Sequence, residues 1–167
     1  MPSGIFNNSN PQPFSSMDFV LQKCTSSLDP AWLEFRLALW PESSAEEHLA
    51  EMEEQLSLSS RHHHLLATDA TGTPVGLAEA SVRHDYVNGT SSSPVAFLEG
   101  IYVHPSWRRH GVARALVAAV MNWGRSQGCG ELASDALLEN TSSHLMHEAL
   151  GFEETERVVY FRMSLNR

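Results

Sequence analysis

Short apolar runs and longer stretches with helical spacing follow one another along the chain. The short runs predict strands at 19–23, 65–68, 75–82, 95–103, 132–136, 152–154 and 158–163. Apolar residues three and four positions apart predict helices at 30–40, after Ser43, from 112 to Gly124 or Gly128, and at 141–150. The order is strand, two helices, three strands, helix, strand, helix and two strands, which predicts one mixed α/β domain over residues 17–167.

Several of the predicted helices have recognisable ends. Asp29 followed by Pro30 is typical of a helix start, with Asp29 as the N-cap. The pattern Ser43-x-x-Glu46 predicts a capping box for the second helix. Gly151 is expected to end the last helix in the left-handed conformation. One face of the first helix carries Trp32, Leu33, Arg36, Leu37 and Trp40.

Composition and charge narrow the class of partner. The chain has 167 residues, of which 42% are hydrophobic and 19% charged, enough apolar material for the core of one domain. Its formal net charge of −9 disfavours nucleic acid and anionic membranes as partners and suits a cationic ligand. The second predicted helix has an acidic face, which is either solvated surface or an approach for a polycation. The face comprises Glu46, Glu47, Glu51, Glu53 and Glu54.

Cysteine usage and segment composition predict a cytoplasmic protein. Cys24 and Cys129 lie far apart without metal-ligand or redox spacing, so we expect reduced thiols. No apolar run approaches the roughly 20 residues that a membrane-spanning helix needs, and no secretory signal pattern is evident. Residues 1–16 are rich in Pro, Asn and Ser; we expect a disordered leader or an artificial extension, with Met17 as the natural start.

Two groups of histidines invite a metal interpretation that their spacing disfavours. His62, His63 and His64 are consecutive in a predicted strand, so their side chains point to alternating faces and cannot all bind one ion. His144 and His147 share one helix face but have no third ligand nearby in the sequence. We therefore expect no metal.

The stretch from Glu99 to Leu116 predicts an anion-binding site. An apolar strand ends in a short basic loop, which opens a helix through Arg108-x-x-Gly111-x-Ala113. The first backbone N–H groups of a helix lack partners and lie at the positive end of the helix dipole. A glycine there lets a phosphate approach the backbone, and the arginines around it can pair with phosphate oxygens.

This loop resembles the acyl-CoA loop of the GCN5-related N-acetyltransferases, which follows the pattern (Arg/Gln)-x-x-Gly-x-(Gly/Ala). Asn140 at the start of the last helix and Gly151-Phe152 at its end match a second landmark of that family. The resemblance implies a central mixed, mostly antiparallel sheet flanked by helices. It also implies acetyl-CoA contacts at Ile101, Tyr102, Val103, Arg108, Arg109, His110, Gly111, Val112, Ala113, Arg114 and Asn140.

Longer segments resemble the aminoglycoside 6′-N-acetyltransferases. They are Leu39-Trp40-Pro41, 83–89, Ser92-Ser93-Pro94, 97–101, Ala133-Ser134-Asp135 and 154–158. This resemblance implies aminoglycoside contacts at Trp40, Tyr86, Glu99, Asp135 and Glu156. The residue types suit such a ligand, because ammonium groups bind carboxylates and sugar rings pack on aromatic faces. Two alternatives stay open: Trp40 extends the core-facing side of the first helix, and Glu156 lies in a polar turn.

Direct acetyl transfer from a thioester to an amine requires the amine to lose a proton. Glu99 is the candidate base or amine orienter, with a paired structural carboxylate as the alternative. A bulge in this strand would re-aim its side chains, and the N–H of Tyr102 or Val103 would stabilise negative charge on the thioester oxygen. Many family members protonate the leaving thiolate with a Tyr four residues before the helix-ending Gly. His147 occupies that place here and is the candidate acid, with water as the alternative.

Three functions are compatible with these patterns. The first is acetylation of an aminoglycoside antibiotic, at the 6′ amine, which would confer resistance. The second is acetylation of a polyamine or another cationic amine, and the third is a non-catalytic acyl-CoA sensor. The family often forms homodimers through its C-terminal strands, and the apolar run Val158-Val159-Tyr160-Phe161 predicts such an edge.

Overall fold

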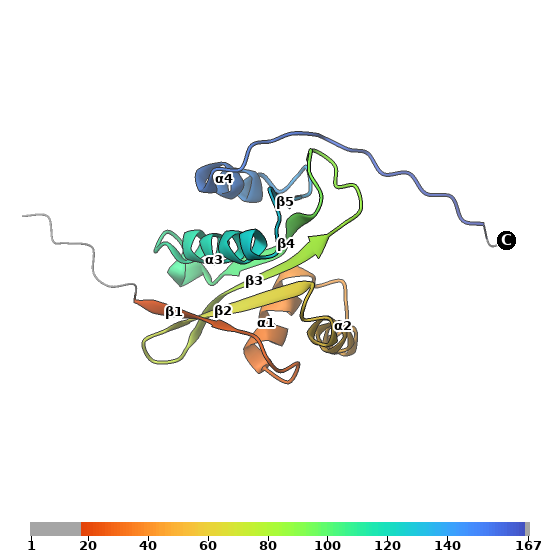
Figure 1. The fold of residues 1–167 in the computed structure, drawn as a ribbon. Helices are drawn as coiled ribbons and strands as arrows, with labels where there is room; N and C mark the ends of the chain where they lie inside the picture. The colour runs from red at the N-terminus through yellow and green to blue at the C-terminus, as the bar shows by residue number, and fades with distance from the viewer. Residues whose placement is uncertain (1–17, 166–167) are drawn as a thin grey trace, which may run out of the picture.

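The computed structural model describes residues 18–165, so the predicted leader lies outside the described residues. One sheet with strand order β1-β2-β3-β4-β5 forms the centre (Figure 1). The elements are β1 (Phe19–Lys23), α1 (Pro30–Leu39), α2 (Ala45–Ser57), β2 (His62–Asp69), β3 (Pro74–Arg83), β4 (Val95–Val103), a 3-10 turn (Pro105–Trp107), α3 (Val112–Ser126), β5 (Leu132–Ser134) and α4 (Thr141–Leu150).

The sheet is mixed and mostly antiparallel, as predicted. β1 to β4 pair antiparallel in chain order, and β5 pairs with β4 in parallel. A parallel neighbour needs a crossover connection, and α3 provides it between β4 and β5. The crossover places α3 against one face of the sheet.

The helices divide between the two faces of the sheet. α1 and α2 lie on one side and α3 and α4 on the other (Figure 1). Beneath α1 and α2, Trp32, Met52 and Leu77 are completely buried. Beneath α3, Leu116 and Val120 pack with the opposite side chains of the sheet. Burial of the two apolar layers is the main stabilising contribution to the fold.

The helix caps confirm most of the sequence signals and correct one. Asp29 caps α1 and accepts a hydrogen bond from the Ala31 N–H at 3.0 Å. The capping box of α2 is formed by Ser44 and Glu47, one residue later than predicted. Gly151 ends α4 with φ +93°, as expected.

The prediction of two closing strands is wrong, since the described residues from Phe152 to Leu165 contain no strand. The segment after α4 instead extends away from the sheet (Figure 1). Val159, Tyr160 and Phe161 are 74%, 83% and 92% exposed in it. Apolar residues give a segment the tendency to form a strand, but a strand forms only where a sheet edge pairs with it. Within the described part of the chain, the segment pairs with no such edge.

The remaining strands and helices fall close to their predicted bounds. β1, β4 and α4 have the bounds that the sequence predicts. β2 and β3 are longer at both ends than their apolar runs, and β5 is shorter. Within residues 18–165, no helix is long and apolar enough to cross a membrane.

Candidate active site

A bulge in β4 sets the geometry of the site. Glu79 of β3 pairs with Gly100, but the next residue, Ala80, pairs with Leu98. Glu99 is therefore the extra residue in β4, which confirms the expected bulge. An extra residue bends its strand and re-aims the side chains around it.

Beyond the bulge, β4 separates from β5. β5 pairs only with Ala96, Phe97 and Leu98 of β4. Among the described residues, 99–103 therefore have no strand on their β5 side, and all five are half-buried. Backbone N–H and C=O groups on such an edge need partners, which an extended amide-bearing ligand would supply. The expected contacts Ile101, Tyr102 and Val103 lie on this edge.

Glu99 is held by two residues of β3. Arg83 donates from Nη2 to Glu99 Oε2 at 2.7 Å and from Nε to Oε1 at 3.2 Å. The Ser81 hydroxyl donates to the same Oε1. The Arg83 guanidinium also lies over the Phe97 ring, 3.4 Å from its centroid. A bidentate ion pair of this kind fixes the direction of the carboxylate.

Arg83 is a residue of the site that sequence reasoning missed. It belongs to the segment 83–89, which resembles the aminoglycoside 6′-N-acetyltransferases, and it directly follows the strand predicted at 75–82, whereas the structure includes it in β3. The bulge at Glu99 shifts the register of β3 and β4, however, so the sequence does not show which β3 side chain faces the carboxylate.

The basic loop presents an open helix N-terminus. Gly111 is the N-cap of α3, with φ +84° and no side chain capping the helix. A Cβ added there would meet nothing within 4 Å, so the space above the first turn is free. Arg109 before it also has a positive φ, +66°. The first N–H groups of α3 are thus available to an anion, which fits a diphosphate.

The side chains of the loop differ in what they can reach. Arg108, Arg109 and His110 are exposed. Val112 is buried in the core under α3, so only its backbone faces the loop. Arg114 donates to the Ala149 carbonyl of α4 at 3.1 Å, which joins the two helices. Arg108, Arg109 and Arg114 are all exposed, so each can contribute positive charge to an anion at this helix start.

Asn140 and His147 lie at opposite ends of α4. The Asn140 side chain caps the helix and accepts from the Ser143 N–H at 3.1 Å. His147 lies against β5, with Nε2 2.9 Å from the Ser134 hydroxyl oxygen. Ser134 in turn donates to the Leu98 carbonyl at 3.1 Å, beside the bulge. His147 is thereby joined to the point where β4 and β5 separate.

Both ring nitrogens of His147 have polar neighbours. Its Nδ1 lies 2.8 Å from the Ser143 carbonyl, which can only accept. The Ser134 hydroxyl uses its proton on Leu98 and accepts at its oxygen. Nδ1 also lies 3.3 Å from the Ser143 hydroxyl, which can donate or accept, so the tautomer decides which ring nitrogen carries a proton.

Trp40 and Asp135 flank the bulge. Trp40 is the C-cap of α1, and a Cβ added at Gly100 would lie 2.7 Å from two carbons of its indole ring. The ring is therefore seated on Gly100 of β4, the residue that follows Glu99. Asp135 is exposed and follows Ser134, the residue that pairs with Leu98. The structure thus places Trp40 against Gly100, next to the bulge, and Asp135 directly after the strand that pairs with Leu98.

Tyr86 lies on the loop between β3 and β4, and Glu156 lies on the C-terminal segment that crosses this loop. Tyr86 is 79% exposed. A Cβ added at Gly89 in this loop would clash with the Thr155 hydroxyl, so the C-terminal segment passes over the loop. Glu156 follows Thr155 and is exposed. Glu131 anchors the far end of the loop by accepting from the Ser92 N–H at 2.7 Å.

The histidines of β2 belong to the packing of the sheet. His64 is 3% exposed, its ring lies 4.9 Å from that of Trp32, and neither ring nitrogen has a hydrogen-bond partner. Burial lowers the pKa of His64 to about 3. His63 lies on the other face, stacked on Trp123 at 5.1 Å. Within residues 18–165, no three His, Cys, Asp or Glu side chains form a group that could hold a metal ion.

Comparison with known proteins agrees with this geometry. Residues 28–152, about three-quarters of the chain, match the model of the acetyltransferase (GNAT) family. The chain belongs to the acetyltransferase (GNAT) family. Its bulged β4, the open edge after it and the uncapped start of α3 are accordingly features of a GNAT domain.

Two GNAT relatives are especially similar in sequence. The aminoglycoside N(6′)-acetyltransferase type 1 of Stenotrophomonas maltophilia is 52% identical over 146 residues, 87% of this chain and 94% of the relative. The protein of the same name from Salmonella typhimurium is 53% identical over 131 residues, 78% of this chain and 89% of the relative.

This chain is also similar to solved structures of aminoglycoside acetyltransferases. The aminoglycoside 6′-N-acetyltransferase AAC(6′)-Ih from Acinetobacter baumannii has a TM-score of 0.84 and 45% identity, covering 89% of this chain and 99% of that one. AAC(6′)-Iy in complex with the bisubstrate analogue CoA-S-monomethyl-acetylneamine has a TM-score of 0.82 and 47% identity. The similarity covers 87% of this chain and 98% of that one.

Proposed function

We propose that this GNAT protein transfers the acetyl group of acetyl-CoA to the 6′ amine of an aminoglycoside antibiotic and thereby confers resistance. The observation that supports this best is the bulge at Glu99, which lies between the Trp40 ring seated on Gly100 and an open strand edge. The similarity to enzymes named for 6′ acetylation, at about half of all aligned positions, gives the acceptor class.

The donor site lies along β4 and the start of α3. Acetyl-CoA supplies a thioester carbon that an amine can attack. The open edge at Ile101 to Val103 would bind its amide-bearing arm, and the α3 N-terminus with Arg108 and Arg109 would hold the diphosphate. A backbone N–H of Tyr102 or Val103 would stabilise the charge that develops on the thioester oxygen. The Asn140 side chain, which already caps α4, would lie beside the arm of the donor.

The acceptor site lies between α1, the bulge and the loop after β3. Glu99 orients the substrate amine by accepting its hydrogen bond, while Arg83 fixes the direction of the carboxylate. In this arrangement Glu99 orients the substrate amine, and the proton that the amine loses passes to water. Asp135 and Glu156 would bind other ammonium groups of the drug, and Trp40 and Tyr86 would face its rings.

His147 is the proposed acid for the leaving thiolate. It occupies the place where the family resemblance implies a Tyr acid, and its Nε2 lies 2.9 Å from the Ser134 hydroxyl oxygen, beside the β4 bulge. When the C–S bond breaks, one proton moves from the imidazolium to sulfur, and the neutral imidazole regains it from water. The Ser134 hydroxyl holds the ring in place for this step.

The reaction is tested by measuring CoA release from acetyl-CoA with kanamycin, spermidine and a lysine peptide as separate acceptors. We expect turnover with kanamycin that exceeds the other two. Activity confined to spermidine or to the peptide would contradict the acceptor class. No turnover with any acceptor would contradict the enzymatic function.

We also propose that the protein is a homodimer. The apolar segment around Tyr160 and Phe161 is exposed, and β5 is the last strand of the described sheet. A second copy would supply an edge for this segment and bury its side chains. Light scattering should then give the mass of two 18.5 kDa chains, and Phe161→Asp should give one. A monomeric wild-type protein would contradict the proposal.

A cytoplasmic location is proposed on two grounds. Cys24 and Cys129 are both free and buried, which is compatible with a reducing compartment. The proposed donor, acetyl-CoA, is a cytoplasmic metabolite. Fractionation of expressing cells should place the protein with cytoplasmic markers; recovery with periplasmic markers would contradict this location.

A further inference from the structure

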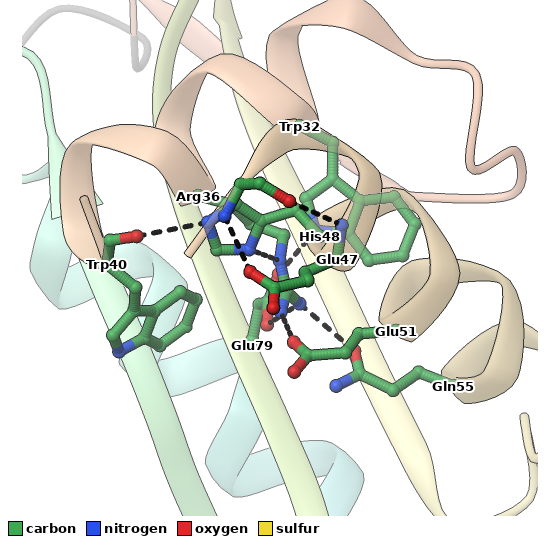
Figure 2. A network of polar contacts seen from close by, with 9 residues as sticks. Trp32, Arg36, Trp40, Glu47, His48, Glu51, Gln55 and Glu79 are labelled. Atoms are coloured by element: carbon green, nitrogen blue, oxygen red, sulfur yellow. Dashed lines mark hydrogen bonds and ion pairs between the residues drawn. The ribbon is translucent and has the colours of Figure 1, made fainter. Parts of the chain in front are cut away.

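A buried polar network beneath α1 and α2 ends at Trp40 (Figure 2). Glu79 of β3 and Arg36 of α1 are 1% and 2% exposed, and Arg36 Nη1 donates to Glu79 Oε2 at 2.8 Å. Trp32 Nε1–H donates to the same carboxylate. Burial raises the pKa of Glu79, and these two donors oppose that rise by stabilising the ionised form. Glu79 is also the register partner of Gly100, the residue on which Trp40 is seated.

Arg36 links this carboxylate to α2 and to His48. Its Nε donates to His48 Nδ1 at 3.2 Å, and its Nη groups also reach Glu51 and Gln55. His48 is 1% exposed, and its Nε2 lies 3.0 Å from the Trp40 carbonyl oxygen. Since Nδ1 accepts, Nε2 carries the proton and donates to Trp40. His48 is therefore the side chain that joins α2 to the end of α1.

Trp40 is thus held at its backbone and at its ring. Its N–H donates to the Arg36 carbonyl at 2.8 Å, and its carbonyl accepts from His48. The Arg36 guanidinium lies 5.0 Å from the indole centroid, and the ring also meets Gly100. A helix C-cap residue with these four contacts has little freedom to move.

We propose that Arg36 and His48, anchored on Glu79, are positioning residues for the acceptor site, because they fix the Trp40 indole beside Glu99. This inference rests on the proposed function, in which Trp40 faces a ring of the aminoglycoside. The side-chain hydrogen bonds of both residues run to α2, to Glu79 of β3 and to the Trp40 carbonyl, and none of them reaches Ile101 to Val103 or the α3 loop. Their loss should therefore weaken acceptor binding and leave acetyl-CoA binding unchanged.

The test compares KM for kanamycin with KM for acetyl-CoA in variants of His48. His48→Leu removes both hydrogen bonds of the imidazole and should raise the kanamycin KM about tenfold, which lies within the range expected for the loss of one or two hydrogen bonds. His48→Gln offers an acceptor and a donor at similar separation and should restore most of the loss. The acetyl-CoA KM should change less than about twofold in both variants.

Two further variants separate positioning from stability and from the proposed function. Met52→Val, at a completely buried position of the same helix outside the network, should lower Tm without raising the kanamycin KM selectively. In a Trp40→Ala background, His48→Leu should have no further effect on this KM.

Three results would overturn the positioning role. They are an unchanged kanamycin KM in His48→Leu, an equal rise in both KM values, and an additive effect in the Trp40→Ala background. If Trp40→Ala itself leaves the kanamycin KM unchanged, Trp40 is not an acceptor contact and the inference fails with it. Turnover of kanamycin by the wild type in the same assay shows separately whether the proposed function holds.

Discussion

The buried histidine of β2 contributes to the pH dependence of stability, and His64→Leu removes that contribution. His64 has a pKa of about 3 in the folded protein, against an ordinary value of 6.5. Between these two values the unfolded chain binds a proton that the folded protein does not. Stability from the neutral ring is therefore complete above pH 6.5 and is lost as pH falls through this window.

The magnitude follows from the two pKa values. Between pH 7.5 and pH 5, the proton taken up only by the unfolded chain lowers the free energy of unfolding by about 2 kcal/mol. His64→Leu should lose that much less stability over the same interval, even though its stability at pH 7.5 differs from that of the wild type. His84→Gln, at an exposed histidine in the loop after β3, is the control.

Urea unfolding followed by circular dichroism at both pH values measures the free energies needed. We expect the wild type and His84→Gln to lose the same free energy between the two pH values, and His64→Leu to lose about 2 kcal/mol less. If all three proteins lose equal stability, His64 is protonated in the folded state and the account of its burial is wrong.

Three more predictions concern the active site, each measured by steady-state CoA release. Gly100→Ala places a Cβ 2.7 Å from the Trp40 indole and should raise the aminoglycoside KM about tenfold without changing the acetyl-CoA KM; equal changes in both would contradict it. Gly111→Ala strains a residue with φ +84° and should raise the acetyl-CoA KM several-fold; an effect on the aminoglycoside KM alone would refute the donor site. Arg83→Met removes two of the three hydrogen bonds that hold the Glu99 carboxylate and should lower kcat/KM for the aminoglycoside about tenfold, with the acetyl-CoA KM unchanged. An unchanged kcat/KM would show that the ion pair does not position Glu99.

Much of the fold follows from local sequence, because β1, β4 and α4 owe their bounds to apolar runs and caps within the element. The capping box of α2 does not follow, since Ser43-x-x-Glu46 and Ser44-x-x-Glu47 overlap and both fit the pattern. The prediction of closing strands was wrong for a different reason. An apolar run gives the tendency to form a strand, but the pairing edge lies elsewhere in the fold.

In the site, too, some features could be predicted from nearby residues, whereas others depend on contacts that form only in the folded chain. The loop around Gly111 and the bulge at Glu99 were predictable from nearby residues and from the family resemblance. The partners Arg83 and His48 were not, because each depends on a register or a helix contact that only the folded chain defines. One signal of the network was present in the sequence, because Arg36 lies on the apolar face of the first helix, where a charged side chain needs a buried partner. In the structure that partner is Glu79.

The most direct test of the central claim compares neomycin and paromomycin, which differ only in having an amine or a hydroxyl at the 6′ position. CoA release should be rapid with neomycin and absent with paromomycin, and the neomycin product should carry one acetyl group on the 6′ nitrogen by mass spectrometry and NMR. Equal release with both drugs, or acetylation at another nitrogen, would contradict 6′ acetyl transfer by this protein.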